Sequence, residues 1–158
     1  MKKAITSIAL GLGCIGAVLL LMAHGNRIPI AVVMPERLTE FEGKAIDLYA
    51  DSLKLLNSFA LLVVGGVGFF VQLIFAKESK VDVTFSIRFL LVLAVVLAGV
   101  SLVFGYESYV NMIDVVAHGF TFDLASPRVA YFQQLQFWAF AGAVASFGGV
   151  SIRMLFGR

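Results

Sequence analysis

The sequence of 158 residues has few charged side chains. Only 14% of its residues are Asp, Glu, Lys or Arg, whereas 60% are hydrophobic. Soluble domains carry about 25% charged and about 45–50% apolar residues. Because a soluble domain must cover its remaining surface with polar groups, the shortage of charge argues against a soluble enzyme, a disordered chain and a nucleic-acid-binding domain. The composition instead predicts a polytopic membrane protein.

Reactive and metal-ligating residues are also scarce. The one cysteine, Cys14, excludes an internal disulfide and a thiol-ligated metal cluster. His24 and His118 lie near predicted helix ends, whereas a haem held within a helical bundle needs histidines at depth. Asp and Glu are absent from the long apolar runs, which argues against a proton-coupled pump. We therefore expect no catalytic site, no cofactor and no metal.

Four long apolar runs dominate the chain. A membrane-spanning helix needs about 20 apolar residues, and backbone in lipid must satisfy its own hydrogen bonds, which favours helices. The predicted fold class is therefore an all-α integral membrane protein, with one domain over residues 1–158 and four transmembrane helices in a bundle. The predicted spans cover residues 4–23, 55–76, 87–106 and 132–153.

The first run could also be a signal peptide, because it follows Lys2 and Lys3. The apolar region of a signal peptide is usually about 7–15 residues long, and this run is longer. No clear small-residue cleavage site follows it. We therefore expect the first run to be retained as a true span.

Two connections between the runs are long and have helical periodicity. Within residues 35–54, Leu38, Phe41, Ala45 and Leu48 recur at spacings of three and four, which predicts an amphipathic helix. Residues 107–118 show the same pattern. We expect both segments to extend the bundle on the extracytoplasmic side. The first could run straight into the second span or bend onto the membrane surface. Pro127, preceded by Ser126, marks the expected start of the fourth helix.

The basic residues are unevenly divided between the two sides of the membrane. If the N-terminus is cytoplasmic, its side carries seven basic and two acidic residues, and the other side carries five basic and eight acidic residues. Lys and Arg are enriched in cytoplasmic segments. We therefore expect a multi-pass protein of the bacterial inner (plasma) membrane with both termini in the cytoplasm.

The basic residues of the inner side are candidates for contacts with lipid headgroups. Arg88 is the only charge well inside a predicted span, where it could reach the headgroups or line a pore. The full set is Lys2, Lys3, Lys77, Lys80, Arg88, Arg153 and Arg158.

Small residues and glutamines mark further candidate surfaces within the spans. Small residues let membrane helices approach closely, either within one chain or between subunits. The candidates for such packing are Gly65, Gly66, Ala94, Ala98, Ala141, Ala145 and Gly149. The candidates for a polar lining are Gln72, Gln133 and Gln136, with Ser101 and Ser146 as further polar residues.

In the layout of its four spans, the chain resembles small membrane subunits of bacterial antiphage systems, which work with a soluble partner. The resemblance covers topology and no motif. The outer helical segments, the faces of small residues and the lack of an assignable site predict a non-catalytic, self-associating subunit that acts as a sensor, anchor or scaffold for a cytoplasmic or membrane protein. Two alternatives remain open, an oligomeric pore or ion channel, and an accessory subunit of a larger transporter or membrane enzyme complex. The expected partners are the lipid bilayer and further copies of the chain, with no nucleic acid.

Overall fold

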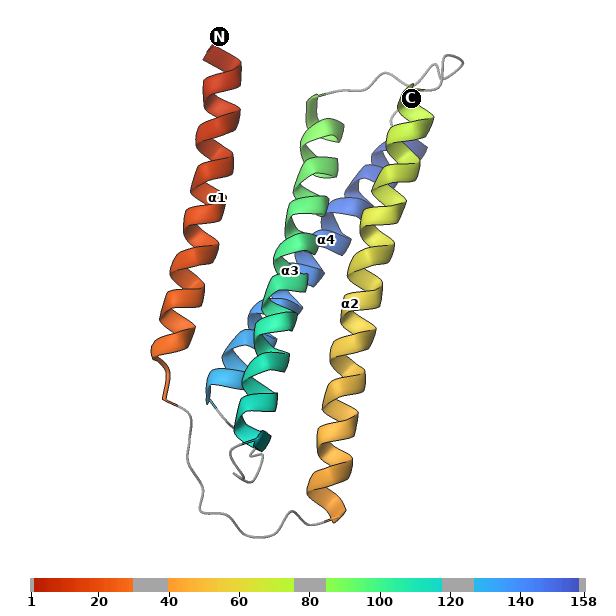
Figure 1. Cartoon of the computed structure of the whole chain (residues 1–158). Coiled ribbons are helices and arrows are strands. Elements are labelled where there is room, and N and C mark those ends of the chain that lie inside the picture. The colour runs from red at the N-terminus through yellow and green to blue at the C-terminus, as the bar shows by residue number, and fades with distance from the viewer. Residues whose placement is uncertain (1, 30–39, 76–84, 118–126, 157–158) are drawn as a thin grey trace.

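The computed structural model describes residues 2–29, 40–75, 85–117 and 127–156, which contain four α-helices (Figure 1). All of the described regular secondary structure is helical, in agreement with the predicted fold class. The helices are α1 (Lys2–Arg27), α2 (Glu40–Phe75), α3 (Phe85–Ala117) and α4 (Pro127–Phe156).

Three of the helices contain a segment that is long and apolar enough to cross a membrane. The segments have 27, 30 and 28 residues, and each exceeds the about 20 residues that a bilayer core requires. The chain therefore has the character of a helical membrane protein. The three segments are Ile46–Gln72 in α2, Phe85–Asp114 in α3 and Pro127–Met154 in α4.

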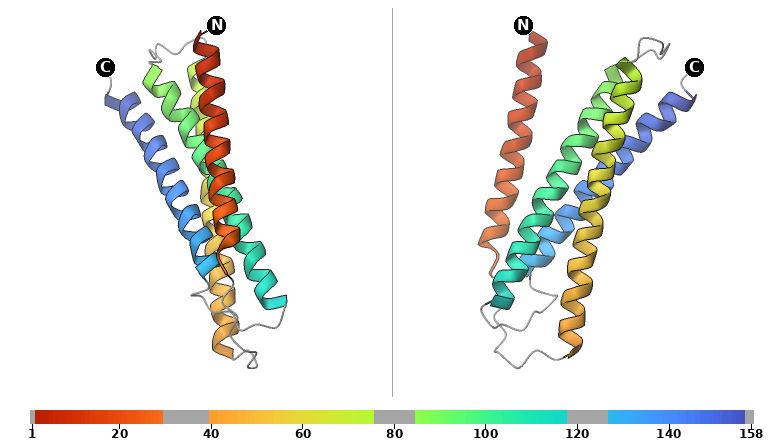
Figure 2. Two further views of the ribbon diagram at one scale, coloured as in Figure 1. Left: turned by 90° about the vertical axis from the view of Figure 1, so that its left-hand side faces the viewer. Right: turned by 45° about the vertical axis from the view of Figure 1, so that its right-hand side comes forward.

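Successive helices run in opposite directions, so that α1 begins and α4 ends at the same end of the molecule (Figures 1 and 2). We call this the terminal end, and we call the opposite end, where α1 ends and α2 begins, the distal end. The most extensive contact is between α3 and α4, and α2 packs against both. α1 contacts α4. Figure 2 shows that α2 reaches beyond the other helices at the distal end.

The core follows one continuous face of α3 and one of α4. Buried positions alternate at spacings of three and four residues, which is the pattern of a coiled-coil seam. Small side chains are frequent on the α3 face, and they allow close helix approach where lipid provides no hydrophobic drive. The buried residues of these two faces are Ile87, Leu91, Ala94, Ala98, Ser101, Gly105, Ser108 and Met112 on α3, and Val129, Phe132, Gln136, Ala139, Ala143, Ser146 and Val150 on α4. Further buried residues are Phe104 and Asn111 on α3, and Tyr49, Leu53, Ala60, Val63 and Val67 on α2.

The helices pass without a break through the expected borders between spans and extensions. α2 is one helix from Glu40 to Phe75, so the described part of the 35–54 segment continues straight into the second apolar run. α3 likewise continues through residue 107 to Ala117. α4 begins at Pro127, the expected first helical residue, whereas Ser126 lies outside the described residues.

Candidate functional site

Two polar layers lie inside the bundle formed by α2, α3 and α4. In the layer nearer the distal end, the buried hydroxyls of Tyr49 and Ser108 share a hydrogen bond. Ser108 Oγ donates a second bond to the Val129 carbonyl over 3.4 Å. Since a serine hydroxyl has one proton to give, Tyr49 is then the donor to Ser108. This chain of bonds joins all three helices.

The second layer joins the same helices closer to the terminal end. Gln136 Nε2 donates to Asn57 Oδ1 over 3.0 Å, linking α4 to α2. Ser101 Oγ donates to the Gln136 backbone carbonyl over 3.1 Å, linking α3 to α4. The Gln136 side chain is fully buried, whereas Asn57 is half-buried. We call the Asn57 and Gln136 side chains the amide layer.

Gly105 makes room for the amide layer. A Cβ at this position would lie 2.5 Å from Gln136 Nε2 and 2.7 Å from Asn57 Oδ1. Both distances are well below the about 3.5–4.0 Å at which non-bonded carbon atoms pack. The absence of a side chain at Gly105 is therefore what allows the two amides to meet beside α3.

One atom of the amide layer has no hydrogen-bond partner among the described residues. This atom is Gln136 Oε1, which is buried. Reversing both amides would let Asn57 donate to Gln136 Oε1, but Gln136 Nε2 would then lose its acceptor. Leaving a buried polar group unpaired costs about 1–3 kcal/mol. The amide layer is thus incompletely satisfied in either orientation.

The amide layer separates two apolar clusters. The larger cluster lies toward the terminal end and includes Ala60, Ala98 and Ala143. The smaller cluster lies toward the distal end and consists of Tyr49, Leu53, Met112 and Val129. The amide layer therefore interrupts the apolar core between these two clusters.

A different set of contacts fastens the end of α1 to the start of α4. Arg128 Nε donates to the Ile28 carbonyl over 2.8 Å, and Arg128 Nη2 donates to the Asn26 carbonyl over 2.6 Å. These bonds satisfy carbonyls that the helix end leaves without an intrahelical partner. We call this set, together with the contacts in the next paragraph, the α1 clasp.

Close packing reinforces the α1 clasp. A Cβ on Gly25 would lie 2.5 Å from the Phe132 ring, so α1 approaches α4 closely at this residue. The ring of His24 meets that of Tyr131 edge to face, with centroids 5.7 Å apart. The Tyr131 hydroxyl also donates to the Leu21 carbonyl over 3.4 Å.

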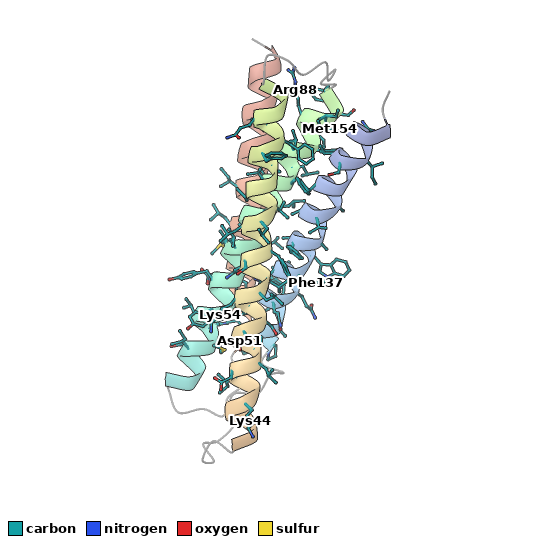
Figure 3. The ribbon with its side chains drawn as sticks, turned by 90° about the vertical axis from the view of Figure 1, so that its right-hand side faces the viewer. Lys44, Asp51, Lys54, Arg88, Phe137 and Met154 are labelled. Carbon is teal, nitrogen blue, oxygen red and sulfur yellow. The ribbon has the colours of Figure 1, made fainter. Side chains whose placement is uncertain are left out.

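The basic residues proposed to contact lipid are only partly described. Arg88 and Arg153 are exposed near the terminal end, and Figure 3 labels Arg88 there. Lys2 and Lys3 belong to the first turn of α1, whose side chains are not described. Lys77, Lys80 and Arg158 lie outside the described residues.

The small residues expected at helix interfaces divide into two groups. Ala94 and Ala98 are fully buried in the larger apolar cluster. A Cβ on Gly66 would lie 2.7 Å from the Phe147 ring, and one on Gly149 would lie 3.6 Å from Leu90. In contrast, Ala141 is half-buried, and Gly65 and Ala145 are exposed. On α4, the face that enters the core is therefore that of Ala139 and Ala143 rather than that of Ala141 and Ala145.

The glutamines expected to form a polar lining do not lie on one surface. Gln72 is exposed and Gln133 is half-buried, whereas Gln136 lies in the core. Ser146 is also buried, and its hydroxyl donates to the Gly142 carbonyl of its own helix over 2.8 Å.

Sequence reasoning missed Tyr49, Asn57, Gly105 and Ser108 as members of this site. The signal for two of them was present in α3. Ser101, Gly105 and Ser108 continue the Ala94 and Ala98 series at spacings of four and three. The polar partners on α2 had no comparable signal. Tyr49 fell in the segment 35–54, which was considered apart from the span, and Asn57 is an isolated polar residue near the start of the predicted span 55–76.

Within the described residues, no group of three His, Cys, Asp or Glu side chains could hold a metal ion. No protein-family model matches the chain, and no curated protein or solved structure is detectably similar to it. The geometry itself defines the class, a helical membrane protein in which buried polar side chains join the chain's own helices.

Proposed function

We propose that this chain is a non-catalytic, self-associating four-span membrane subunit that acts as a sensor, anchor or scaffold for a partner protein. The observation that carries the proposal is the continuity of α2 from Glu40 to Phe75. One rigid helix joins an exposed charged stretch, which includes Lys44, Asp47 and Asp51, to an apolar segment that can cross the membrane. A partner bound at the distal end could therefore act on the terminal end through α2.

The length and surface of α1 support a fourth crossing. Its apolar run over residues 4–23 is about 30 Å long at 1.5 Å per residue, equal to the thickness of a bilayer core. Ile15, Leu19 and Leu20 are exposed, as expected for side chains that face lipid. In this proposal the basic terminal end faces the cytoplasm of a bacterial inner membrane.

The α1 clasp indicates at which level of the bundle the distal surface of the membrane would lie. The apolar run of α1 ends at Ala23, next to the contact between Gly25 and Phe132. The centroids of the Phe132 and Phe104 rings are 6.2 Å apart. The end of the α1 apolar run therefore corresponds to the level of Phe104 on α3. Figure 3 shows Lys44 farther toward the distal end than Asp51 and Lys54. The start of α2 would then stand outside the lipid, where a partner can reach it.

Small residues on outward faces support self-association. A Cβ on Gly13, Gly16, Gly65 or Gly68 would have no described atom within 4 Å. These glycines belong to α1 and α2, so both helices have open positions where a neighbouring helix can approach closely. They take no part in packing among the described residues of the chain itself.

The pore alternative receives less support from the same geometry. A pore between subunits needs polar side chains on the outer surface of each subunit. Ser101, Gln136 and Ser146 instead face the core of their own bundle, whereas Gln72 is exposed and Gln133 half-buried. The accessory-subunit alternative differs from our proposal in stoichiometry, because the chain would then occur at a fixed ratio with larger partners.

Cysteine cross-linking in intact membranes tests self-association directly. In a Cys14→Ser background, Gly13→Cys and Gly65→Cys place a thiol on the outward faces of α1 and α2. We expect mild oxidation to give a covalent dimer for at least one of them. The matched control is Ala98→Cys, whose side chain is buried in the bundle, and it should give none. If no outward cysteine gives a dimer, self-association through these faces is wrong.

A further inference from the structure

The unpaired oxygen of Gln136 is the feature of the core that the proposed function does not use. Gln136 has no exposed surface, and its Oε1 has no partner among the described residues. If the oxygen and nitrogen positions of both amides are exchanged, Gln136 Oε1 gains a partner but Gln136 Nε2 then has no hydrogen-bond acceptor. A complete set of hydrogen bonds therefore needs a group that these helices do not supply.

The surroundings of the amide layer favour a small polar ligand over an apolar one. Asn57 and Gln136 meet through one bond of 3.0 Å, and the Ser101 hydroxyl is bonded to the backbone carbonyl of Gln136. Water both donates and accepts hydrogen bonds, and buried waters in proteins commonly pair with polar groups of this kind. An apolar ligand would leave the oxygen unpaired.

The amide layer also lies close to the distal surface. Gln136 is one helical turn along α4 from Phe132, the residue that packs on Gly25 near the end of the α1 apolar run. Asn57, on the α2 side, is only half-buried. The shortest route for water into the layer therefore leads from the distal end past Asn57.

We propose that the amide layer binds one water molecule, which enters from the distal end when α2 moves away from α3 and α4. The water donates a hydrogen bond to Gln136 Oε1. Because Gln136 is fully enclosed in this structure, entry requires a helix to move. α3 and α4 share the most extensive helix contact and the bond from Ser101. The described side-chain bonds of α2 to these helices are those of Asn57 with Gln136 and of Tyr49 with Ser108. α2 is therefore the helix that moves.

The consequence is a bundle with two arrangements, a closed one with an unpaired oxygen and a hydrated one with α2 displaced. Pairing the buried oxygen favours the hydrated form, and close packing of α2 favours the closed form. Because α2 is unbroken, displacement at the amide layer moves its whole length. This inference concerns one chain and holds whether or not the chain self-associates.

Solid-state NMR of the full chain in phosphatidylcholine and phosphatidylglycerol vesicles tests the proposal. The measurement is the transfer of magnetisation from water to the Gln136 side-chain amide. The exposed Gln134 side chain serves as the wet reference and the buried Ala98 backbone amide as the dry reference. We expect transfer to Gln136 several-fold faster than to Ala98. Transfer as slow as that to Ala98 would overturn the proposal.

A pair of variants separates bound water from general exposure of the bundle. In the double variant Asn57→Leu with Gln136→Met, both amides are gone, and we expect transfer to the nearby Gly105 backbone amide to fall to the level of Ala98. Gln133→Met, a half-buried position on the same helix, should leave transfer to Gly105 unchanged. Unchanged transfer to Gly105 in the double variant would contradict a water held by these amides. If that variant does not fold, the measurement on the unaltered chain still decides.

Discussion

Gly105 governs the contact between α2 and α4 although it belongs to α3. Its missing side chain leaves the space in which Gln136 and Asn57 form their hydrogen bond. Within lipid, such a contact between side chains contributes to helix association that the hydrophobic effect does not drive. A single methyl group at this position should therefore disturb all three helices.

We expect Gly105→Ala to lower the free energy of unfolding in detergent micelles by about 1–3 kcal/mol, the usual cost of overpacking a core. The new Cβ would lie 2.5 Å from Gln136 Nε2 and 2.7 Å from Asn57 Oδ1. Reversible denaturation followed by circular dichroism measures the change.

Gly99→Ala is the matched control for this prediction. It makes the same substitution on the same helix, but no described atom lies within 4 Å of the added Cβ. Its stability should equal or exceed that of the unaltered chain, because alanine favours a helix over glycine by about 1 kcal/mol. Equal effects of the two substitutions would show that close packing at Gly105 is not important.

At the same residue scale, the sequence predicted some packing positions and not others. Ala94 and Ala98 were expected at an interface and are buried. Ala141 and Ala145 on α4, candidates for packing within the chain or for a subunit interface, lie outside the buried seam, so the subunit interface is the alternative that stays open for them. In a membrane helix both the lipid-facing and the core-facing side are apolar, so hydropathy does not distinguish them. Only contacts with a second helix decide which face is buried.

The four helices differ in how they are held. α2, α3 and α4 share a core with two polar layers, whereas the described contacts of α1 with the bundle concentrate near its distal end. Arg128 is central to that attachment, since it bonds two carbonyls at the end of α1. The attachment of α1 can therefore be changed without altering the shared core.

We expect Arg128→Ala to loosen α1 while leaving the other helices folded. Hydrogen bonds from a charged group contribute about 1.5–3 kcal/mol each, so loss of two should let the distal end of α1 separate from α4. Spin labels at the exposed residues Leu20 and Trp138, in a Cys14→Ser background, report the distance between the helices.

The distance distribution should broaden in the Arg128→Ala protein. Arg153→Ala is the control, because Arg153 is exposed near the opposite end of the same helix. It removes the same charge and should leave the distribution narrow. A narrow distribution in both variants would mean that Arg128 does not fasten α1.

At the scale of elements, the sequence predicted the helices better than their ends. The apolar runs gave the positions of α1 to α4 because each run is long and uncharged. Continuous helix crosses the borders near residues 54 and 106, since helical hydrogen bonds continue wherever no proline or cap ends them. For residues 40–54 this is the straight continuation, one of the two alternatives that the sequence left open. The charges that suggested a separate segment, such as Asp51 and Lys54, occupy the exposed face of α2.

In the whole molecule, the described polar contacts in the core and at α1 are all contacts within one chain. The amide layer, the bond between Tyr49 and Ser108, and the α1 clasp all connect helices of one chain. Outward surfaces are mainly apolar, with glycines on α1 and α2 that no described atom approaches. The proposed function places the activity of the protein in its assembly with other chains.

Native mass spectrometry of the complex extracted from its own membrane tests the central claim most directly. The full chain would carry a tag at its C-terminus, which the proposal places in the cytoplasm. The account predicts a closed oligomer of this chain, with any further partner bound to that oligomer. A monomer, or a fixed ratio of one copy to unrelated larger chains, would contradict it and make the protein an accessory subunit.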